Sequence, residues 1–220
     1  MKLVLASGSQ RRRELLTMCG YDYEIIVSNA DETIDENDPE SFVCALSFRK
    51  AKEVFDRLFA AGRRDFAVIG SDTVVAFQKE GETKPVIIGK PKDAEDAVRI
   101  LSMLSGKTHR VFTGVSVIAD IPDENAAAQC SIREKAEIQT ECSITEVTFE
   151  TLSPDEIADY VNSGDPLDKA GSYGIQGPFG MFVREIRGNY FTVIGMPIPV
   201  LYKMLKKIGI LPHGFYERIE

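Results

Sequence analysis

Residues 6–13 read Ala-Ser-Gly-Ser-Gln-Arg-Arg-Arg, and they stand between a short apolar run and a helical pattern. Residues 2–6 predict a first strand, and residues 14–19 predict a helix that ends at Gly20. Ser9 is a natural N-cap for this helix. Free backbone N–H groups and the positive end of the helix dipole meet at such a turn, and arginines offer donors that match phosphate oxygens. The stretch therefore predicts an anion-binding loop, with a solvated basic turn as the alternative.

The composition is that of an ordinary globular protein with an acidic charge. The 220 residues are 44% hydrophobic and 27% charged, and the formal net charge is −8. This length fits one α/β domain of two lobes or two small domains, and we expect a single domain over residues 1–220. An acidic protein is a poor general nucleic-acid binder, although locally gathered basic groups can still hold a small anion. No run of about 18 apolar residues is present, so we expect no membrane span.

The cysteines and histidines do not form a metal-binding pattern. The four cysteines contain no CxxC pair, and the two histidines are far apart in the sequence. Three of the cysteines fall in helix-like or strand-like patterns, where a free cysteine is usually a small core residue. The first residues lead directly into a strand without a signal-peptide pattern. We therefore expect a cytoplasmic protein with reduced cysteines.

A long helix is predicted from Pro39 to about Ala61, with Asp38 as its N-cap. Lys50 falls on the apolar stripe of this helix, between Leu46 and Val54. A lysine at such a position either extends its amine to the edge of the core or meets a buried anion. Both possibilities remain open from the pattern alone.

The most informative apolar run is residues 66–77, FAVIGSDTVVAF, which predicts a strand interrupted by residues 70–73. Asp72 lies inside it, and a buried aspartate is costly unless it is paired, protonated or bound to a metal. A functional aspartate is therefore favoured over a turn aspartate. The acidic loop of residues 28–38 holds Glu32, whose alternative is simple solvation.

The remaining elements follow from periodicity and capping residues. Strands are predicted at residues 21–27, 86–88, 108–119 and 136–149, and a hairpin at 181–186 and 190–194. Helices are predicted at 93–104, 153–162 and 197–208. A change of parity near Thr145 and Glu146 predicts a bulge. Residues 165–180 form a glycine-rich loop that permits close backbone approach to a ligand, and residues 120–133 a long hairpin excursion.

Taken in order, the motifs are SGSxRR, an acidic DE loop, the lysine-bearing helix, GSDTVV, GKPKDAEDA, SGKTHRVFTGV and DKAGSYGIQG. This series resembles the Maf family of nucleoside triphosphate pyrophosphatases over about residues 2–205. The resemblance implies an α/β fold with a long twisted mixed sheet flanked by helices and two lobes around a cleft, similar to the inosine triphosphate pyrophosphatases. It also implies hydrolysis between the α- and β-phosphates, which yields a monophosphate and pyrophosphate. Gln10 departs from the family, where proline is frequent, and the 120–133 excursion is longer than usual.

The resemblance also implies roles for individual residues. Asp72 matches the general base, and Lys50 and Lys90 match phosphate-binding lysines that act with it in catalysis. Glu32 and Asp72 match the carboxylates expected to hold a divalent cation, Mg²⁺ or Mn²⁺; the residues leave open whether Asp72 is base or metal ligand. The expected substrate-binding residues are Ser7, Ser9, Arg11, Arg12, Thr73 and Gln176. The set of Arg11, Thr73 and Gln176 is similar to the branch that acts on dTTP and UTP.

Two other functions remain open from the sequence. One is a nucleotide-sensing regulator of cell division or septum formation without catalysis, and the presence of Asp72 and Glu32 counts against it. The other is a purine enzyme of the inosine triphosphate type, and Gln176 counts against that. The expected partners are a nucleotide substrate and, by the resemblance, a second copy in a homodimer, with neither nucleic acid nor membrane.

Overall fold

A computed structural model describes residues 1–79, 81–121 and 136–214 of the chain. The strands are β1 (Lys2–Leu5), β2 (Glu24–Ile25), β3 (Phe66–Phe77), β4 (Val86–Ile88), β5 (Thr108–Asp120), β6 (Ala136–Phe149) and β7 (Val183–Arg187). The α-helices are α1 (Gln10–Met18), α2 (Pro39–Ala60), α3 (Ala94–Leu104), α4 (Pro154–Asn162), α5 (Tyr190–Ile194) and α6 (Ile198–Lys207). Three 3₁₀ segments are η2 (Asp165–Asp168), η3 (Ala170–Ser172) and η4 (Pro178–Phe182). Most of the excursion expected at residues 120–133 lies outside the described residues.

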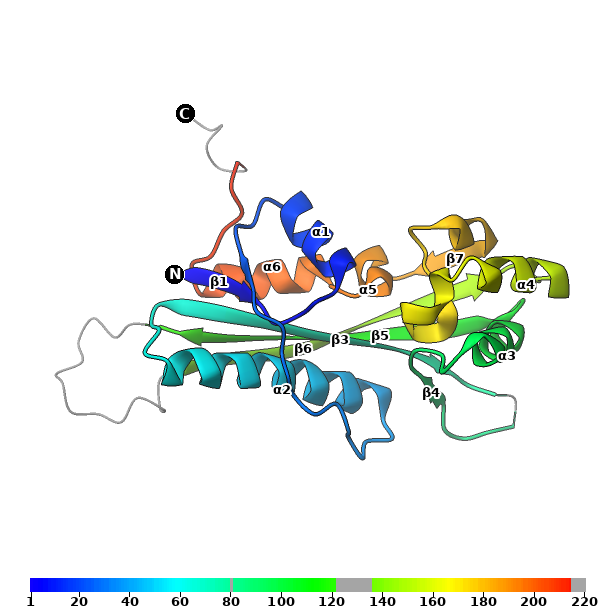
Figure 1. Ribbon diagram of the computed structural model, residues 1–220, viewed down its shortest axis with the longest axis horizontal. Helices are drawn as coiled ribbons and strands as arrows, with labels where there is room; N and C mark the ends of the chain where they lie inside the picture. Colours follow the sequence, from blue (N-terminus) through cyan, green and yellow to red (C-terminus); the bar gives the residue numbers. More distant parts are fainter. Residues whose placement is uncertain (80, 122–135, 215–220) are drawn as a thin grey trace.

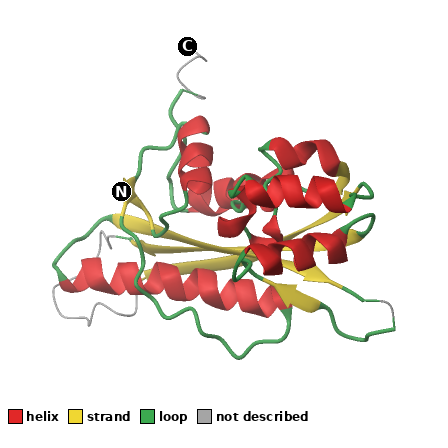
Figure 2. Cartoon of the chain, turned by 45° about the vertical axis from the view of Figure 1, so that its right-hand side comes forward, coloured by secondary structure: helices red, strands yellow, loops and turns green. Residues whose placement is uncertain are grey.

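The seven strands of the described residues form one mixed sheet (Figure 1). The strand order is β2-β1-β3-β5-β6-β7, and β4 pairs with β3. β1 pairs in parallel with β2 and β3, whereas the other pairs are antiparallel. Helices lie on both faces of the sheet: α2 runs beneath it in Figure 1, and α1, α5 and α6 lie above it, an arrangement also visible in Figure 2. The expected α/β class, with a mixed sheet flanked by helices, is confirmed.

Two hydrophobic cores lie along the face of the sheet that α1 and α6 cover. Ile69 of β3 belongs to the core that contains α1 and α6, whereas Val75 belongs to a second core with α3 and α4. Ser71 and Thr73 stand between these two residues, and because side chains alternate along a strand they point to the same face. A polar section of β3 therefore separates the two cores.

Helix α2 lies unusually close to the sheet on its other face. Asp38 caps the helix by accepting a hydrogen bond from the Ser41 N–H at 2.9 Å, and Pro39 occupies its first turn, as predicted. A Cβ atom at Gly70 of β3 would lie 2.1 Å from the carbonyl oxygen of Ser47. Glycine thus allows α2 to approach β3 next to Asp72, which brings the middle of the helix within reach of that residue.

The predicted strand at residues 190–194 is wrong, because these residues form helix α5. Asn189 precedes the helix, and its side chain accepts a hydrogen bond from the Phe191 N–H at 2.9 Å. Gly195 then ends the helix in the left-handed region, with φ of 111°. A strong cap at each end outweighs the strand preference of the aromatic and β-branched residues between them.

Some element boundaries and two local features of the sheet also differ from the prediction. α1 begins at Gln10 rather than Glu14, with Ser9 at the N-cap position but without a side-chain cap bond, and β2 covers only Glu24–Ile25. β3 continues through the section expected to interrupt it, because residues 70–73 remain paired with β5. The bulge expected at Thr145 and Glu146 is absent from the described pairing of β5 and β6; the irregularity lies between Thr148 and Phe149, where β6 meets β7.

Candidate active site

A short section of β3 lies between two strand partners on one edge. On this edge β1 pairs with β3 as far as Ile69, and β4 pairs with it from Val75 onward. The register leaves residues 70–74 between these partners, and in the described structure no strand covers them on this side. The chain leaves β1 at this point to form the arginine turn, residues 6–13. Asp72 thus stands where the sheet edge is open, beside the turn predicted to bind an anion.

Asp72, Lys50 and Glu32 form one charged cluster at this opening. Lys50 Nζ donates to Asp72 Oδ1 at 2.7 Å and lies 2.9 Å from Glu32 Oε1. The side chains of Lys50 and Asp72 are each only 12% exposed, whereas that of Glu32 is 65% exposed. A buried aspartate needs such a partner. Of the two alternatives for Lys50, the one in which it meets a buried anion is confirmed.

Arg12 links the arginine turn to β3 and to the turn after α5. Its Nε donates to the Gly195 carbonyl at 2.8 Å, Nη1 to Ser7 Oγ at 3.2 Å and Nη2 to Thr73 Oγ1 at 3.3 Å. Burial lowers the pKa of Arg12, and the charge of Asp72 opposes that shift. A guanidinium carries five N–H groups, so three serve in these contacts while the side chain stays protonated. Arg12 is held firmly and keeps donor capacity for an anion.

Hydroxyl groups of β3 and β5 form hydrogen bonds next to Arg12. Thr113 Oγ1 donates to the Thr192 carbonyl at 2.7 Å, and it also lies 3.0 Å from Thr73 Oγ1. Because a hydroxyl has one proton, Thr73 must donate to Thr113 and accept from Arg12. Ser71 Oγ contacts the carbonyls of Gly114 and Gly195, each at 3.0 Å. This direction of donors fixes the orientation of Thr73 at the opening.

The other predicted site residues have no direct contact with Asp72 or Lys50 among those that the structure shows. Ser9 is half-buried, and its N–H donates to Ser7 Oγ at 3.2 Å. Arg11 Nη1 lies 3.3 Å from Asp168 Oδ2 in η2. Lys90 and Gln176 are exposed, and a backbone bond from Gly171 N–H to the Gly89 carbonyl at 3.0 Å joins the loop before Lys90 to the glycine-rich loop, residues 165–180. The structure thus brings Asp72, Lys50 and Glu32 into direct contact and joins Arg12, Ser7 and Thr73.

Several residues that shape the site were not predicted from the sequence. They are Ser71, Thr113, Gly195, Asp168 and Lys169. Gly195 acts through its backbone carbonyl, which leaves no side-chain pattern. Asp168 and Lys169 stand in the DKAGSYGIQG motif, and their charge in a glycine-rich loop is the signal that could have indicated them.

His109 contacts the glycine-rich loop through Tyr173. This residue of β5 is buried, and its Nε2 lies 2.9 Å from the hydroxyl oxygen of Tyr173. Burial lowers the pKa of His109 from 6.5 to about 3. The histidine is therefore neutral in the folded protein throughout the physiological range, and its charging accompanies unfolding.

We expect the free energy of unfolding to fall as the pH decreases from about 6.5 towards 3. In this range the unfolded chain binds one more proton at His109 than the folded chain, so the loss is about 1.4 kcal/mol per pH unit. Above pH 6.5 this contribution is fully present. Denaturant unfolding of wild type and His109→Gln between pH 8 and 5 measures the difference in slope. Parallel curves for the two proteins would contradict this assignment.

The donor set at the opening fits a divalent cation bound together with a phosphate. Glu32 and Asp72 both lie within hydrogen-bonding distance of one atom, Lys50 Nζ, so two carboxylates face the same point. No group of three or more His, Cys, Asp or Glu side chains among the described residues could hold a metal on its own. Mg²⁺ typically uses one or two carboxylates and takes its other ligands from water and phosphate oxygens.

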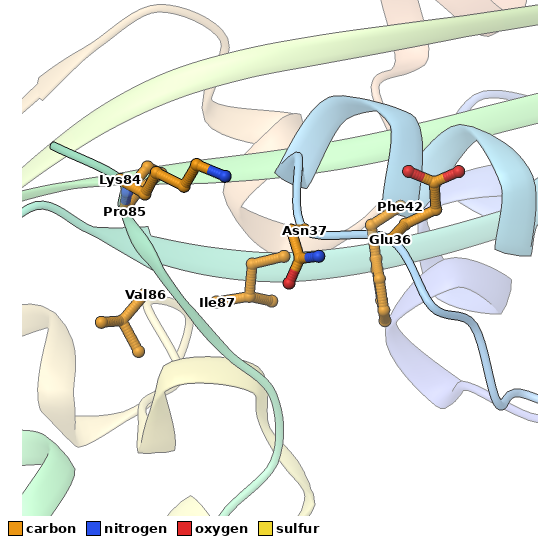
Figure 3. Close-up of a pocket in the computed structure, with 7 residues that line it drawn as sticks. All are labelled: Glu36, Asn37, Phe42, Lys84, Pro85, Val86 and Ile87. Atoms are coloured by element: carbon orange, nitrogen blue, oxygen red, sulfur yellow. The ribbon is translucent and has the colours of Figure 1, made fainter.

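Two of the surface hollows among the described residues lie outside this centre. One has a volume of about 360 Å³ and is lined by residues of the acidic loop, α2 and the β4 region (Figure 3): Glu36, Asn37, Phe42, Lys84, Pro85, Val86 and Ile87. The other, of about 290 Å³, lies by the glycine-rich loop and β7 and is lined by Ile175, Gly180, Val183, Arg184, Glu185, Ile186 and Tyr190. Neither hollow is lined by Asp72, Lys50 or Arg12.

None of the described helices is long and apolar enough to cross a lipid bilayer. Cys19, Cys44 and Cys142 are free thiols.

Comparisons with known proteins agree with the motif order. The chain is 41% identical over 217 residues to the dTTP/UTP pyrophosphatase of Agathobacter rectalis, covering 95% of this chain and 98% of the relative. It is 42% identical over 210 residues to the dTTP/UTP pyrophosphatase of Bacillus thuringiensis subsp. konkukian, covering 95% and 96% of the two chains. Among solved structures, the Ham1 protein of Staphylococcus aureus covers 94% of this chain and is itself covered fully, with a TM-score of 0.44 and 14% identity. Residues 2–208 match the family model described as Maf-like protein, and the chain therefore belongs to the Maf family.

Proposed function

We propose that this protein hydrolyses nucleoside triphosphates, preferably dTTP and UTP, to the nucleoside monophosphate and pyrophosphate in a house-cleaning role. The observation that carries the proposal is the pairing of Asp72 with Lys50 at the open section of β3, beside the arginine turn. The names of the relatives from Agathobacter rectalis and Bacillus thuringiensis support the same substrates. A triphosphate requires positioning and charge neutralisation more than covalent chemistry, and this site offers cations beside the carboxylates of Asp72 and Glu32.

Each group at the site has a distinct role in this reaction. Backbone amides and hydroxyls of the arginine turn, with Arg12, Lys50 and the exposed Lys90, bind phosphate oxygens. Lys50 contacts Oδ1 of Asp72, which leaves Oδ2 to accept a proton from the attacking water. Water adds to the α-phosphorus, the bond from this phosphorus to the oxygen that bridges to the β-phosphate breaks, and pyrophosphate leaves with that oxygen. Glu32 would hold Mg²⁺ or Mn²⁺, which supplies charge neutralisation on the phosphates, and Asp72 would join it as a ligand in the alternative in which Oδ2 does not act as the base.

A phosphate-release assay tests the proposed reaction. The full chain is incubated with each common nucleoside triphosphate and Mg²⁺, with and without added inorganic pyrophosphatase. Phosphate should appear from UTP and dTTP only when the pyrophosphatase is present, and a chelator should abolish formation of the nucleoside monophosphate. Phosphate release without pyrophosphatase, or no release from any nucleotide, would contradict the proposal.

We propose that Gln176 recognises the base edge. An amide both donates and accepts, so it can pair with the adjacent carbonyl and N–H of uracil or thymine. A purine presents a different edge and needs more room, and polar groups that binding leaves unpaired are costly. Cytosine discrimination should be weaker, because the amide can rotate. Gln176→Ala should lower kcat/KM for UTP and dTTP more than for GTP. Equal loss on UTP, dTTP, CTP and GTP would instead indicate that Gln176 only braces its loop.

We also propose that the protein is a cytoplasmic homodimer that takes no nucleic acid and no membrane as partner. Free thiols support a reducing compartment. Ile138 and Ile144 of β6 have exposed fractions of 54% and 43%, which supports a partner on this part of the sheet. Light scattering at micromolar concentration distinguishes a dimer from a monomer.

A further inference from the structure

Lys169 ties the first part of the glycine-rich loop together. Its side chain is only 13% exposed, and Nζ donates to the carbonyl of Asp165 at 2.6 Å, to Asp165 Oδ1 at 2.9 Å and to Asp168 Oδ1 at 2.7 Å. An ammonium has three donors, so all three are used. A Cβ atom at Gly174 would lie 2.6 Å from Lys169 Cε, so the lysine stem packs directly on the loop backbone. Lys169 therefore acts as a structural clamp on this part of the loop.

The same network continues into the body of the protein. Tyr160 of α4 donates through its hydroxyl to Asp165 Oδ2 at 2.5 Å and accepts from the Gly174 N–H at 3.1 Å. Burial raises the pKa of Tyr160, and the hydrogen bond to Asp165 adds to that shift, so the hydroxyl remains a donor at neutral pH. The Gly177 N–H bonds to the Gly174 carbonyl at 3.2 Å, which places the turn around Gln176 directly on this anchored backbone.

Asp168 joins this clamp to the arginine turn. Oδ1 accepts from Lys169 at 2.7 Å, while Oδ2 lies 3.3 Å from Arg11 Nη1. Burial alone would raise the pKa of Asp168, but the hydrogen bond from Lys169 and the charge of Arg11 hold it below its usual value. The neighbouring residue, Arg12, is fixed independently through Gly195. One carboxylate therefore spans two parts of the site that are 157 residues apart in the chain.

We propose that Asp168 is a positioning residue that sets the direction of Arg11 and the spacing between the arginine turn and the loop that carries Gln176. The Arg11 and Asp168 side chains are 30% and 68% exposed, so their ion pair adds little to stability. Its effect is on substrate binding. Its hydrogen bond with Lys169 fixes the carboxylate of Asp168, and this carboxylate in turn orients the long side chain of Arg11. This inference rests on the proposed function for its substrate.

The test compares Asp168→Asn, Arg11→Ala and the double variant. The asparagine keeps the size of the side chain and removes its charge. KM for UTP should rise on the order of fivefold in Asp168→Asn, with kcat nearly unchanged, since the lost interaction orients a binding group. The melting temperature should stay at the wild-type value. Asp168→Glu, which keeps the charge, should recover part of the loss. Asp159→Asn, an exposed change on α4, serves as the matched control and should behave like wild type.

The double variant decides whether Asp168 acts through Arg11. Asp168→Asn should add nothing in the Arg11→Ala background, because the group it positions is gone. The proposal would be overturned if the KM increases of the two single variants multiplied in the double variant, or if Asp168→Asn alone left KM unchanged. Calorimetric binding of a non-hydrolysable UTP analogue to the same variants separates this result from the fate of the proposed function. If wild type does not hydrolyse UTP, but the variants lose affinity for the analogue in the coupled pattern described above, only the proposed function is refuted. If wild type does not bind the analogue, both the proposed function and the role of Asp168 are overturned.

Discussion

Replacing Asp72 with asparagine should lower kcat for UTP hydrolysis on the order of 100- to 10,000-fold, the range typical of a lost general base. The amide keeps the shape of the side chain, so the packing of β3 against α2 is retained. It removes the charge that Lys50 Nζ contacts at 2.7 Å and the oxygen that would accept a proton from water. Steady-state kinetics with UTP and Mg²⁺ at equal concentrations of folded protein measures the effect.

A matched substitution distinguishes the loss of the catalytic carboxylate from the loss of one negative charge elsewhere on the protein. Asp159→Asn makes the same change on the exposed face of α4, and its kcat should equal that of wild type. Turnover by Asp72→Asn at the wild-type rate would show that the aspartate is structural.

Gly70→Ala should destabilise the protein by about 3 kcal/mol or more, because the added carbon meets backbone rather than a flexible side chain. The new Cβ would lie 2.1 Å from the carbonyl oxygen of Ser47 and 2.7 Å from the backbone nitrogen of Ala51. These residues flank Lys50 on α2, so relief of the clash moves Lys50 away from Asp72. We therefore expect a melting temperature lower by roughly 6 to 12 °C and reduced activity below that temperature.

Gly89→Ala is the control for this prediction. A Cβ atom added at Gly89 would have no heavy atom within 4 Å apart from those of its chain neighbours, and the φ of Gly89 lies outside the left-handed region. The melting temperature of this variant should match that of wild type. If Gly70→Ala melted at the same temperature as Gly89→Ala, the close approach of α2 to β3 would be wrong.

The elements with strong local signals were predicted well from the sequence. Ser153 and Glu156 form the predicted capping box of α4, and Asp93 caps α3. The apolar stripe of α2 correctly placed Lys50 on the buried side. These features depend on residues three or four positions apart, so the local sequence pattern is enough to predict them.

The errors occurred where distant contacts or caps decide the structure. Residues 190–194 have strand-forming side chains, but Asn189 and Gly195 make them helical. The predicted interruption of β3 did not account for its pairing with β5, which continues on the covered edge. Such pairing depends on residues about 40 positions away and leaves no local trace.

The candidate site was predicted in part for the same reason. Asp72 was conspicuous as a charge within an apolar run, and the arginine turn as a basic cluster in an acidic chain. The contact of Arg12 with Gly195 crosses 183 residues and uses a backbone carbonyl, so periodicity cannot indicate it. Asp168 has the sequence context of an ordinary loop acid, and only the fold brings its two oxygens to Lys169 and Arg11.

The most direct test of the central claim is ³¹P NMR of UTP incubated with Mg²⁺ and either wild type or Asp72→Asn. Wild type should convert UTP to UMP and pyrophosphate in equal amounts without UDP, and Asp72→Asn should leave UTP almost intact over the same period. Formation of UDP and phosphate, or equal conversion by the two proteins, would contradict the assignment of Asp72 as the group that drives pyrophosphate release.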